Sequence, residues 1–394
     1  MINDNEKKNL PMVKIYSESP LKFFGGGERL IIMIYKSLKE NGIEAKVVEN
    51  NNNKVESRVG DKDILEELGE DLLSERFRRY GFPRFIYQDF PDLQELKSSS
   101  SSIFLIFLRR LPPKSILSQF STFPKTKVVF CLHGVALEKL RLTDPRIMIH
   151  QLIIRRQLSV FAPFVKINIY AQCLIPNIGN YLQFKGANKN NIFIIENEIE
   201  SGITNIIRND SLFQVIFIGR MSNLSKGINF LRKVIKKVGK IDSSIKFIVI
   251  GSGPDVHILD GLNENCTVLT NADDAVKKGI LMSSNLATIT SNLEPFSLVA
   301  VEFLTSGLPV VTTPASGPSY IVGKDNIFGK ISSFSVNSFS EEIILYHKMW
   351  KSDKDAYYKM RKNIAEKARS IFDEKRMPDS YLRMIVEVGS SWWE

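Results

Sequence analysis

The pattern of hydrophobic and polar positions near the start of the chain predicts a strand, a helix and a second strand. Residues 13–17, Val-Lys-Ile-Tyr-Ser, predict a short strand, and a triplet of glycines follows at 25–27. Between Glu28 and Asn41 apolar residues recur every three or four positions, as on one face of a helix, and 45–48 is again strand-like. This order of strand, glycine turn, helix and strand opens a doubly wound parallel sheet.

The remainder of the first half contains a polar stretch and three further strand-like runs. Residues 50–100 are mostly polar and end in the serine run 98–102, so we expect a surface loop there. Residues 128–132 are fully apolar and predict a strand, and strands are also expected at residues 166–170 and 192–195.

The alternation of strands and helices starts again after residue 205. Strands are expected at residues 214–219, 247–251, 267–270, 286–290 and 308–312, and helices at 227–238, 273–282 and 296–306. From Glu341 onward the apolar spacing is helical. We therefore predict an α/β protein of two Rossmann-like, doubly wound domains, residues 1–205 and 206–370, whose strand ends face a central cleft.

The length and composition of the chain are those of a two-domain globular protein. Its 394 residues suffice for two domains, and shares of 43% apolar and 24% charged residues exclude a disordered or fibrous chain. The three cysteines, Cys131, Cys173 and Cys266, are far apart and predict buried thiols in a reducing compartment. With a polar start and no apolar run of about 18 residues, we expect a soluble, cytoplasmic protein.

Positive charge is concentrated in one part of the chain. The formal net charge is +10, and residues 101–190 carry 13 Lys and Arg side chains against two acids, Glu138 and Asp144. Such an excess favours an anionic partner, and a nucleotide, a nucleic acid and an acidic membrane surface remain as alternatives.

The glycines between the first strand and the first helix are one candidate for chemistry. Without a Cβ in the way, the backbone N–H groups of Gly25–Gly27 at a helix start let an anion or a sugar hydroxyl approach closely. The triplet also suits a plain turn with positive φ, and it matches neither the GxGxxG nor the P-loop pattern.

A pair of basic residues follows the first strand of the second domain. Gly219-Arg220 ends that strand, and Lys226-Gly227 opens the next helix. A guanidinium, an ammonium and a helix N-terminus together suit a diphosphate. Basic residues also occur at the ends of plain surface loops, so the pattern alone leaves both interpretations open.

Two carboxylates lie eight residues apart, Glu294 in a loop after a strand and Glu302 inside the following helix. Eight residues are about 2.2 helical turns, so Glu302 returns to the face on which the helix starts. The neighbours of Glu302 are apolar, and a buried carboxylate needs a partner. Ligand hydroxyls would serve, as would a backbone group or a core arginine.

In this order and spacing the motifs resemble those of retaining glycosyltransferases of the GT-B fold, in the family known as family four or glycosyl transferases group 1. The resemblance covers nearly the whole chain and is strongest over residues 214–323. It is carried by Phe217-Ile-Gly-Arg-Met with Lys226-Gly, by Val249-Ile-Gly-Ser-Gly-Pro, and by Glu294 and Glu302 followed by Ser306-Gly-Leu-Pro-Val-Val. For the fold, it implies that a C-terminal helix within residues 371–394 packs back on the first domain.

The resemblance also implies a role for each candidate residue. Arg220 and Lys226 would grip the donor diphosphate and stabilise the leaving nucleotide. Glu294 would lie beside the donor sugar, and Glu302 would bind the ribose hydroxyls. His133, at the end of a parallel strand, would face the reacting sugar and completes the catalytic candidates. The other implied donor-binding residues are Gly26, Gly27, Gly219, Phe296, Ser297 and Leu298.

The implied reaction is a hexosyl-type transfer from a nucleoside-diphosphate sugar with retention of anomeric configuration, and no metal or other cofactor is implied. The chain has Glu294-Pro-Phe-Ser where this family usually has Glu-Gly-Phe-Gly, a change that bears on which donor is used. Two Asp-x-Asp patterns, at Asp61–Asp63 and Asp353–Asp355, lie in polar stretches and are expected to be surface residues instead of metal ligands.

The basic segment bears on the acceptor, which this fold usually holds in its first domain. The excess charge of residues 101–190 suits a glycan or lipid-linked acceptor presented at the inner face of an anionic membrane, contacted peripherally. Residues 103–110 and 147–160 mix apolar and basic side chains, as interfacial segments do. The alternative is a buried strand and a solvated basic helix.

Two other classes of protein compete with this interpretation. A nucleic-acid-binding or nucleic-acid-modifying protein would also use the positive charge, but the sequence has no zinc-ligand spacing and no aromatic–basic RNA motif, so no nucleic acid is expected. A non-catalytic, sugar-nucleotide-binding subunit of the same fold is disfavoured because the four charged motif residues are all retained. These are Arg220, Lys226, Glu294 and Glu302.

Overall fold

The chain forms two compact units, as a computed structural model of it shows. Unit 1 comprises Met1–Leu137, His150–Asn197 and Lys375–Glu394, and unit 2 comprises Glu138–Ile149 and Glu198–Glu374. The residues that the structure describes are 10–18, 26–50, 68, 71–75, 78–81, 87–90, 102–108, 110–123, 126–141, 144–197, 206–262, 265–372 and 376–390.

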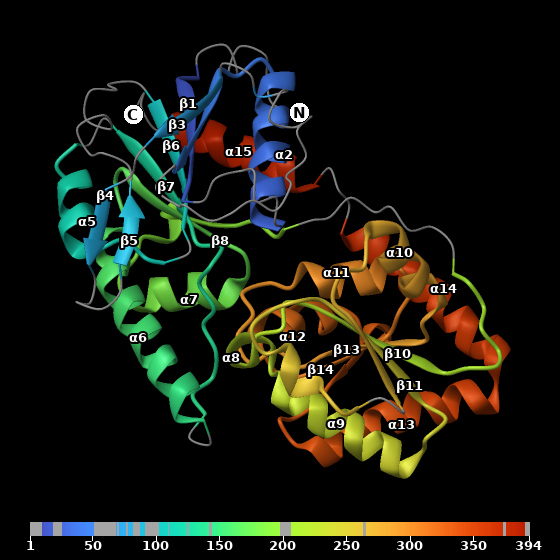
Figure 1. The fold of residues 1–394 in the computed structure, drawn as a ribbon. Helices are drawn as coiled ribbons and strands as arrows, with labels where there is room; N and C mark the ends of the chain where they lie inside the picture. The colour runs from blue at the N-terminus through green and yellow to red at the C-terminus, as the bar shows by residue number, and fades with distance from the viewer. Residues whose placement is uncertain are drawn as a thin grey trace. The chain divides into compact units, whose positions relative to one another are not determined.

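A parallel sheet of seven strands forms the centre of unit 1 (Figure 1). In spatial order the strands are β3 (Leu72–Glu75), β2 (Ala45–Asn50), β1 (Met12–Ser17), β6 (Ser102–Phe107), β7 (Lys127–Cys131), β8 (Ile169–Cys173) and β9 (Ile192–Ile194). β1 pairs with both β2 and β6, so the order of the strands reverses between β1 and β6. The central strands β6, β7 and β8 are buried along their whole length, as expected for a parallel sheet covered on both faces.

The helices of unit 1 pack on this sheet and include the C-terminal helix. They are α2 (Gly26–Glu40), α5 (Lys114–Phe120), α6 (Pro145–Phe161, of which the residues up to Ile149 belong to unit 2), α7 (Pro176–Phe184) and α15 (Arg376–Ser390). α15 packs against α2 and β6, and in Figure 1 the red α15 lies beside the blue α2. Its buried side chains, Met377, Tyr381, Ile385 and Val388 among them, belong to the hydrophobic core of unit 1.

In the first half of the chain, one expectation is wrong and one open alternative is decided. Part of the stretch predicted as a loop is strand, because β3 extends the main sheet and β4 (Arg78–Gly81) pairs antiparallel with β5 (Tyr87–Phe90). Residues 103–107 are the interior of β6, and each is at most 7% exposed, so here the alternative of a buried strand is correct and the interfacial segment is not. Their unbroken apolar run reflects burial on both faces of the sheet.

The strand predicted at residues 166–170 begins three residues later, at Ile169. Ile167 has a φ of +58° and is 68% exposed, so it cannot belong to a buried strand. The next residue, Asn168, donates its side-chain N–H groups to the carbonyl oxygens of Phe120, Phe123 and Thr126 at 2.9–3.0 Å. These long-range bonds hold the chain in a turn up to the start of β8.

Unit 2 contains a six-stranded parallel sheet with the strand order of a Rossmann fold (Figure 1). In spatial order the strands are β12 (Cys266–Leu269), β11 (Lys246–Ile250), β10 (Gln214–Ile218), β13 (Leu286–Ile289), β14 (Val310–Thr312) and β15 (Gly329–Ile331). The helices are α8 (Asn223–Lys226), α9 (Ile228–Ile241), α10 (Asp274–Ser283), α11 (Leu298–Thr305), α12 (Ser316–Val322), α13 (Val336–Ser352) and α14 (Lys354–Ile371). α9 packs against α13, and α11 packs against α14. In the described part of the chain, no helix is both long and apolar enough to cross a membrane.

Residues 138–149 belong to unit 2, whereas the sequence placed them inside the first domain. The reason is a set of contacts with residues far along the chain. The guanidinium of Arg141 donates to Asn292 Oδ1 at 2.9 Å and lies 3.6 Å from the centre of the Phe334 ring. Contacts of this kind leave no periodic pattern in the sequence, so the boundary prediction was wrong for this segment.

Candidate functional site

The strand order of unit 2 reverses between β10 and β13, and ligands of doubly wound sheets bind at such a switch point. The segments that follow these two strands are hydrogen-bonded to each other. The backbone N–H groups of Asn292 and Leu293 donate to the carbonyl oxygen of Ser225 at 2.7 and 3.1 Å. The hydroxyl of Thr290 donates to the carbonyl oxygen of Lys226 at 2.8 Å. The turn that carries Lys226 is therefore held beside the loop that carries Glu294.

Gly227 makes this close approach possible. It has a φ of +66°, between α8 and α9, and a Cβ at this position would lie 2.3 Å from the carbonyl oxygen of Thr290. Only glycine combines a left-handed backbone with no side chain, so this residue lets the two segments touch. The sequence singled out Gly227 as the neighbour of a cation, and its structural role is to bring that cation to the switch point.

Lys226 and Glu294 form an ion pair at this point. The ammonium of Lys226 donates to Glu294 Oε2, and the hydroxyl of Ser291 donates to the same oxygen at 2.9 Å. The side chains of Lys226 and Glu294 are 19% and 14% exposed, so each charge is partly desolvated and depends on the other. Two of the predicted catalytic residues therefore lie in direct contact.

Gly219 and Arg220 follow β10 at the same edge of the sheet. A Cβ on Gly219 would lie 3.6 Å from Cε of Lys226, so this glycine borders the lysine stem. Arg220 is exposed and forms no ion pair with any residue that the structure describes. The guanidinium therefore offers its donors to solvent or to a ligand.

The loop between Glu294 and α11 is tightly held. Phe296 is 3% exposed, and Ser297 is the N-cap of α11 with a φ of +87°. The Ser297 hydroxyl accepts a hydrogen bond from the N–H of Ala300 at 3.4 Å. Ser297 thus adopts a left-handed conformation that glycine adopts more easily, at the position where the motif that this loop resembles usually has glycine. Leu298 is the first residue of the helix and presents one of its unpaired N–H groups.

Glu302 lies in α11 and pairs with a lysine of the neighbouring helix α10. Nζ of Lys277 is 2.5 Å from Oε1 of Glu302, and the two side chains are 27% and 22% exposed. The sequence predicted that this acid needs a partner but did not identify Lys277. One of the two carboxylate oxygens of Glu302 is thus engaged.

Glu138, which the sequence noted only as one of two acids in the basic segment, is part of the same region. It is 5% exposed, and its Oε1 accepts the N–H of Glu294 at 3.2 Å and the hydroxyl of Ser316 at 2.9 Å. Its Oε2 accepts the N–H of Ser316 at 2.7 Å. Burial raises the pKa of the Glu138 carboxyl, against the effect of these donors. An isolated acid directly after the apolar run 135–137 was the signal in the sequence.

The backbone on the other side of Glu294 is also clamped. The N–H of Gly317 donates to the carbonyl oxygen of Glu294 at 2.9 Å, and a Cβ on Gly317 would lie 2.4 Å from the carbonyl oxygen of Phe296. Glu138 and the start of α12 therefore bind both the N–H and the C=O of Glu294. The carboxylate of Glu294 extends from a fixed backbone.

In unit 1, His133 follows β7 and is held by three neighbours. Its Nε2 lies 3.0 Å from Gln172 Oε1 and 3.0 Å from the hydroxyl of Tyr381, and its ring packs edge-on against Phe107 with centroids 4.9 Å apart. Burial lowers the pKa of His133 to about 4, so the imidazole is neutral at pH 7. Because the side-chain N–H group of Gln172 donates to Ile195, its Oε1 faces the histidine and assigns the proton to Nε2.

The remaining nitrogen of His133 is therefore an acceptor. Nδ1 is buried and has no hydrogen-bond partner among the residues that the structure describes. Gly26 and Gly27, the other candidates of unit 1, are the first two residues of α2, directly after the segment that follows β1. These three residues lie in unit 1, whereas the other candidate residues lie in unit 2.

The Asp-x-Asp pattern at residues 353–355 has a structural role. Asp353 caps α14 by accepting the N–H of Ala356 at 2.9 Å, and Asp355 pairs with Arg208 at 2.5 Å. The pattern at residues 61–63 lies outside the described residues. Within the described ranges, no group of three or more His, Cys, Asp or Glu side chains could hold a metal ion.

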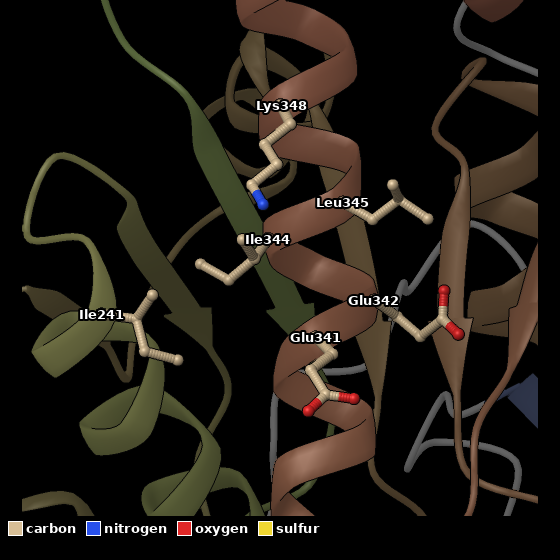
Figure 2. A pocket seen from close by; sticks show the side chains of 6 residues that line it. All are labelled: Ile241, Glu341, Glu342, Ile344, Leu345 and Lys348. Atoms are coloured by element: carbon tan, nitrogen blue, oxygen red, sulfur yellow. The ribbon is translucent and has the colours of Figure 1, made fainter.

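A surface pocket of unit 2 lies away from these residues, between the end of α9 and α13 (Figure 2). Its lining residues are Ile241, Glu341, Glu342, Ile344, Leu345 and Lys348. Ile241 ends α9 just before β11 starts, so the pocket is at the amino ends of the strands. The candidate residues follow the carboxyl ends, where ligands of this fold bind.

Solved structures with the same architecture identify the fold. HepE of Anabaena in complex with UDP matches with a TM-score of 0.67 at 15% identity, over 95% of this chain and 99% of that chain. Sucrose-phosphate synthase of Thermosynechococcus elongatus matches with a TM-score of 0.70 at 13% identity, over 97% and 100%. TarM of S. aureus matches with a TM-score of 0.66 at 12% identity, over 95% and 100%. The chain therefore has the GT-B fold, two Rossmann-like units in one polypeptide.

The family comparison concerns unit 2, where the charged residues lie. Residues 213–346 match the family model described as glycosyl transferases group 1. An uncharacterized glycosyltransferase of Methanocaldococcus jannaschii, MJ1607, is 27% identical over 114 residues. This match spans 27% of the chain and 29% of that relative's length. The region common to that family contains Lys226, Glu294 and Glu302.

Proposed function

We propose that this protein is a glycosyltransferase that moves a sugar from a nucleoside-diphosphate sugar to a carbohydrate or lipid-linked acceptor, with retention of anomeric configuration. The observation that carries the proposal is the Lys226–Glu294 ion pair at the switch point of unit 2. It lies in the region that matches the family model, next to the start of α11. The GT-B fold and the three motif spacings support the same conclusion.

In this proposal, the donor diphosphate lies between the cations and the start of α11. The exposed guanidinium of Arg220 and the ammonium of Lys226 bind phosphate oxygens, and the N–H groups at Leu298 and Val299 complete the site. Lys226 is then shared between a phosphate and Glu294. As that ammonium turns to the phosphate, the Glu294 carboxylate becomes available to accept hydrogen bonds from the hydroxyls of the donor sugar.

The hard step of the proposed reaction is departure of the nucleoside diphosphate. The bond between the anomeric carbon and a phosphate oxygen breaks, a bond to the acceptor oxygen forms on the same face, and the acceptor proton passes to the departing phosphate. Arg220 and Lys226 stabilise the charge that develops on that phosphate, which is commonly the largest contribution to catalysis of this kind. His133 is neutral at pH 7, so in this proposal it contributes no positive charge to the reaction.

Nucleotide binding provides the first test. HepE has been crystallised with UDP and with UDP-glucose, so these are the first ligands to try, followed by GDP and ADP. We expect calorimetric binding of one of the three diphosphates and slow hydrolysis of the matching sugar nucleotide. Lys226→Ala should lower turnover at least about tenfold, or 1.4 kcal/mol in the barrier. Lys278→Ala, an exposed lysine of α10, is the control for the lost charge.

Two results would contradict the proposal. One is the failure of UDP, GDP and ADP to bind to the folded wild-type protein at millimolar concentration. The other is wild-type turnover in the Lys226→Ala variant. Proton NMR of the product, once an acceptor is found, tests retention separately, since an inverted anomer would overturn only that part of the proposal.

We further propose that α6 of the basic segment contacts an anionic membrane surface from which a lipid-linked acceptor is taken. The helix contains no Asp or Glu, and its exposed side chains Arg146, Ile149, Leu152 and Arg156 recur every three or four residues. An apolar stripe with arginines at both ends suits the interface of an acidic bilayer. Vesicles of phosphatidylglycerol should co-sediment the protein at low salt, and Ile149→Ser with Leu152→Ser should abolish this. Equal binding to neutral phosphatidylcholine vesicles would contradict the charge argument.

A further inference from the structure

The contact between Lys277 and Glu302 links two helices beside the proposed donor site. Lys277 lies in the first turn of α10, Glu302 lies in the second turn of α11, and Nζ is 2.5 Å from Oε1. Both side chains are about three-quarters buried, at 27% and 22% exposure. An ion pair at this depth has a more specific geometry than one on the surface, because neither charge is fully hydrated.

The pair engages one carboxylate oxygen and leaves the other without a partner. Lys277 contacts Oε1, and Oε2 of Glu302 makes no hydrogen bond to any residue within the described ranges. An ionised carboxylate accepts about four hydrogen bonds through its two oxygens, so most of this capacity is unused. A ligand with two adjacent hydroxyl groups would use the remaining capacity.

The lysine also determines how the carboxylate is presented. A glutamate side chain has three rotatable bonds, and holding it in one rotamer costs up to about 1.5–2 kcal/mol of conformational entropy. The contact with Lys277 restricts that freedom before any ligand binds. The neighbouring Lys278 is exposed and forms no ion pair among the described residues. It therefore adds a positive charge nearby but does not orient the Glu302 carboxylate.

We propose that Lys277 is a positioning residue that orients Glu302 toward the two ribose hydroxyls of the donor and thereby selects ribonucleotides over deoxyribonucleotides. This inference rests on the proposed function, because it assumes that a nucleoside diphosphate binds at this site. It assigns to Lys277 a role that acts through Glu302. Only the binding of the ribose depends on this lysine, and the binding of the base and of the diphosphate does not.

The experiment compares two ligands in four proteins. Calorimetry measures the binding of UDP and of 2′,3′-dideoxy-UDP to the wild type and to Lys277→Met, Lys278→Met and Lys277→Arg, with GDP or ADP and their dideoxy forms used if one of those binds instead. We expect Lys277→Met to weaken the ribonucleotide about tenfold and the dideoxynucleotide less than twofold. Lys278→Met, which removes the same charge one residue away, should weaken neither more than twofold. Lys277→Arg should restore most of the ribonucleotide affinity.

A kinetic measurement separates positioning from a purely structural role. If Lys277 acts on ground-state binding through Glu302, Lys277→Met raises KM for the sugar nucleotide and leaves kcat within about twofold. A loss of both ligand affinities together, with a lowered melting temperature, would show that the pair only stabilises the fold and would overturn the inference. Lys277→Gln, which keeps a hydrogen-bond donor, serves as a second variant if Lys277→Met does not fold.

The failure of this inference can be told apart from the failure of the proposed function. If the wild type binds no nucleoside diphosphate, the proposed function and the role of Lys277 are both wrong. If the wild type binds UDP and Lys277→Met binds it equally well, the proposed function stands and the role of Lys277 is wrong. An equal loss for UDP and dideoxy-UDP would instead place Lys277 at the phosphates and contradict ribose selection.

Discussion

Ser297 and His133 are two residues whose surroundings impose a conformation or a protonation state. Ser297 keeps a φ of +87° because it must both cap α11 and turn the chain after the buried Phe296. His133 is kept neutral by burial, with its Nε2 engaged and its Nδ1 without a partner among the described residues. Each residue gives a test that needs no knowledge of the substrate.

Substitution of Ser297 should separate the cost of its backbone conformation from the value of its cap. We expect Ser297→Gly to match or exceed wild-type stability, by about 0.5 kcal/mol, because relief of the left-handed strain outweighs a cap loss of a few tenths. Ser297→Ala keeps the strain and loses the cap, so it should be less stable by about 1 kcal/mol. Urea unfolding of the three proteins measures both differences. A glycine variant less stable than the alanine variant would contradict the assigned strain.

Acidification should destabilise the protein through His133. The pKa of this imidazole is lowered from 6.5 to about 4 in the folded state, so the unfolded state binds a proton more readily between these values. The stability that His133 contributes is therefore complete above pH 6.5 and is lost as the pH falls to 4, by about 2–3 kcal/mol. The pH dependence of unfolding should be shallower by this amount in His133→Gln. Parallel curves for the two proteins over this range would show that the histidine does not titrate as assigned.

At the scale of secondary-structure elements, the site depends on connections between segments distant in sequence. Glu138 accepts three hydrogen bonds, one from the N–H of Glu294 and two from the N–H and the hydroxyl of Ser316, the first residue of α12. Gly227 lets the turn before α9 touch the end of β13. In both cases a residue of one segment holds a second segment, distant in sequence, at the carboxyl edge of the sheet.

Removal of the Glu138 carboxylate should loosen the loop that carries Glu294. Glu138→Ala leaves the N–H groups of Glu294 and Ser316 without their acceptor, and each buried unsatisfied donor costs about 1–3 kcal/mol. We expect lower stability by about that amount and a fall in turnover of at least about fivefold, measured by urea unfolding and by release of nucleoside diphosphate. Lys139→Ala, the exposed neighbour, is the control. Unchanged turnover in a destabilised Glu138→Ala variant would limit Glu138 to a structural role.

At the scale of the whole molecule, the two units differ in what they contribute to the proposed reaction. Unit 2 holds the charged residues proposed to bind the donor, while unit 1 holds His133, Gly26 and Gly27 together with most of the basic segment. The sequence has three tryptophans. Trp350 lies in α13 of unit 2, and the other two are Trp392 and Trp393, in the segment assigned to unit 1. This distribution allows unit 2 to be observed by itself.

Nucleotide binding should stabilise the unit that contains Trp350. In a Trp392→Phe, Trp393→Phe variant, the fluorescence of Trp350 alone follows the unfolding of unit 2. A diphosphate at about 100 times its dissociation constant should raise the free energy of that transition by about 2.7 kcal/mol, because the ligand binds only the folded state. Fluorescence-detected unfolding with and without UDP measures the shift. An unchanged Trp350 transition in the presence of a bound nucleotide would place the donor outside unit 2.

The elements that the sequence predicted correctly are those whose periodicity arises from burial alone. The strand at residues 214–218 and the helix from Ile228 have regular apolar positions that become buried positions in unit 2. The predictions failed where a distant partner decided the backbone, as at Asn168, whose side chain binds three carbonyl oxygens more than 40 residues away. The partners Lys277 and Glu138 were missed for the same reason, since Glu138 and Glu294 are 156 residues apart.

By itself, the sequence determined that the chain is an α/β protein of two doubly wound units and that its charged motif residues follow strand ends. Both properties are local, because the spacing of apolar residues and the residues of a turn depend only on positions a few residues apart in the sequence. Only the tertiary structure decided that Lys226 meets Glu294, that Lys277 holds Glu302, and that residues 138–149 join unit 2. These facts depend on which segments pack against each other, and partly buried charges then select the partners that compensate for lost hydration.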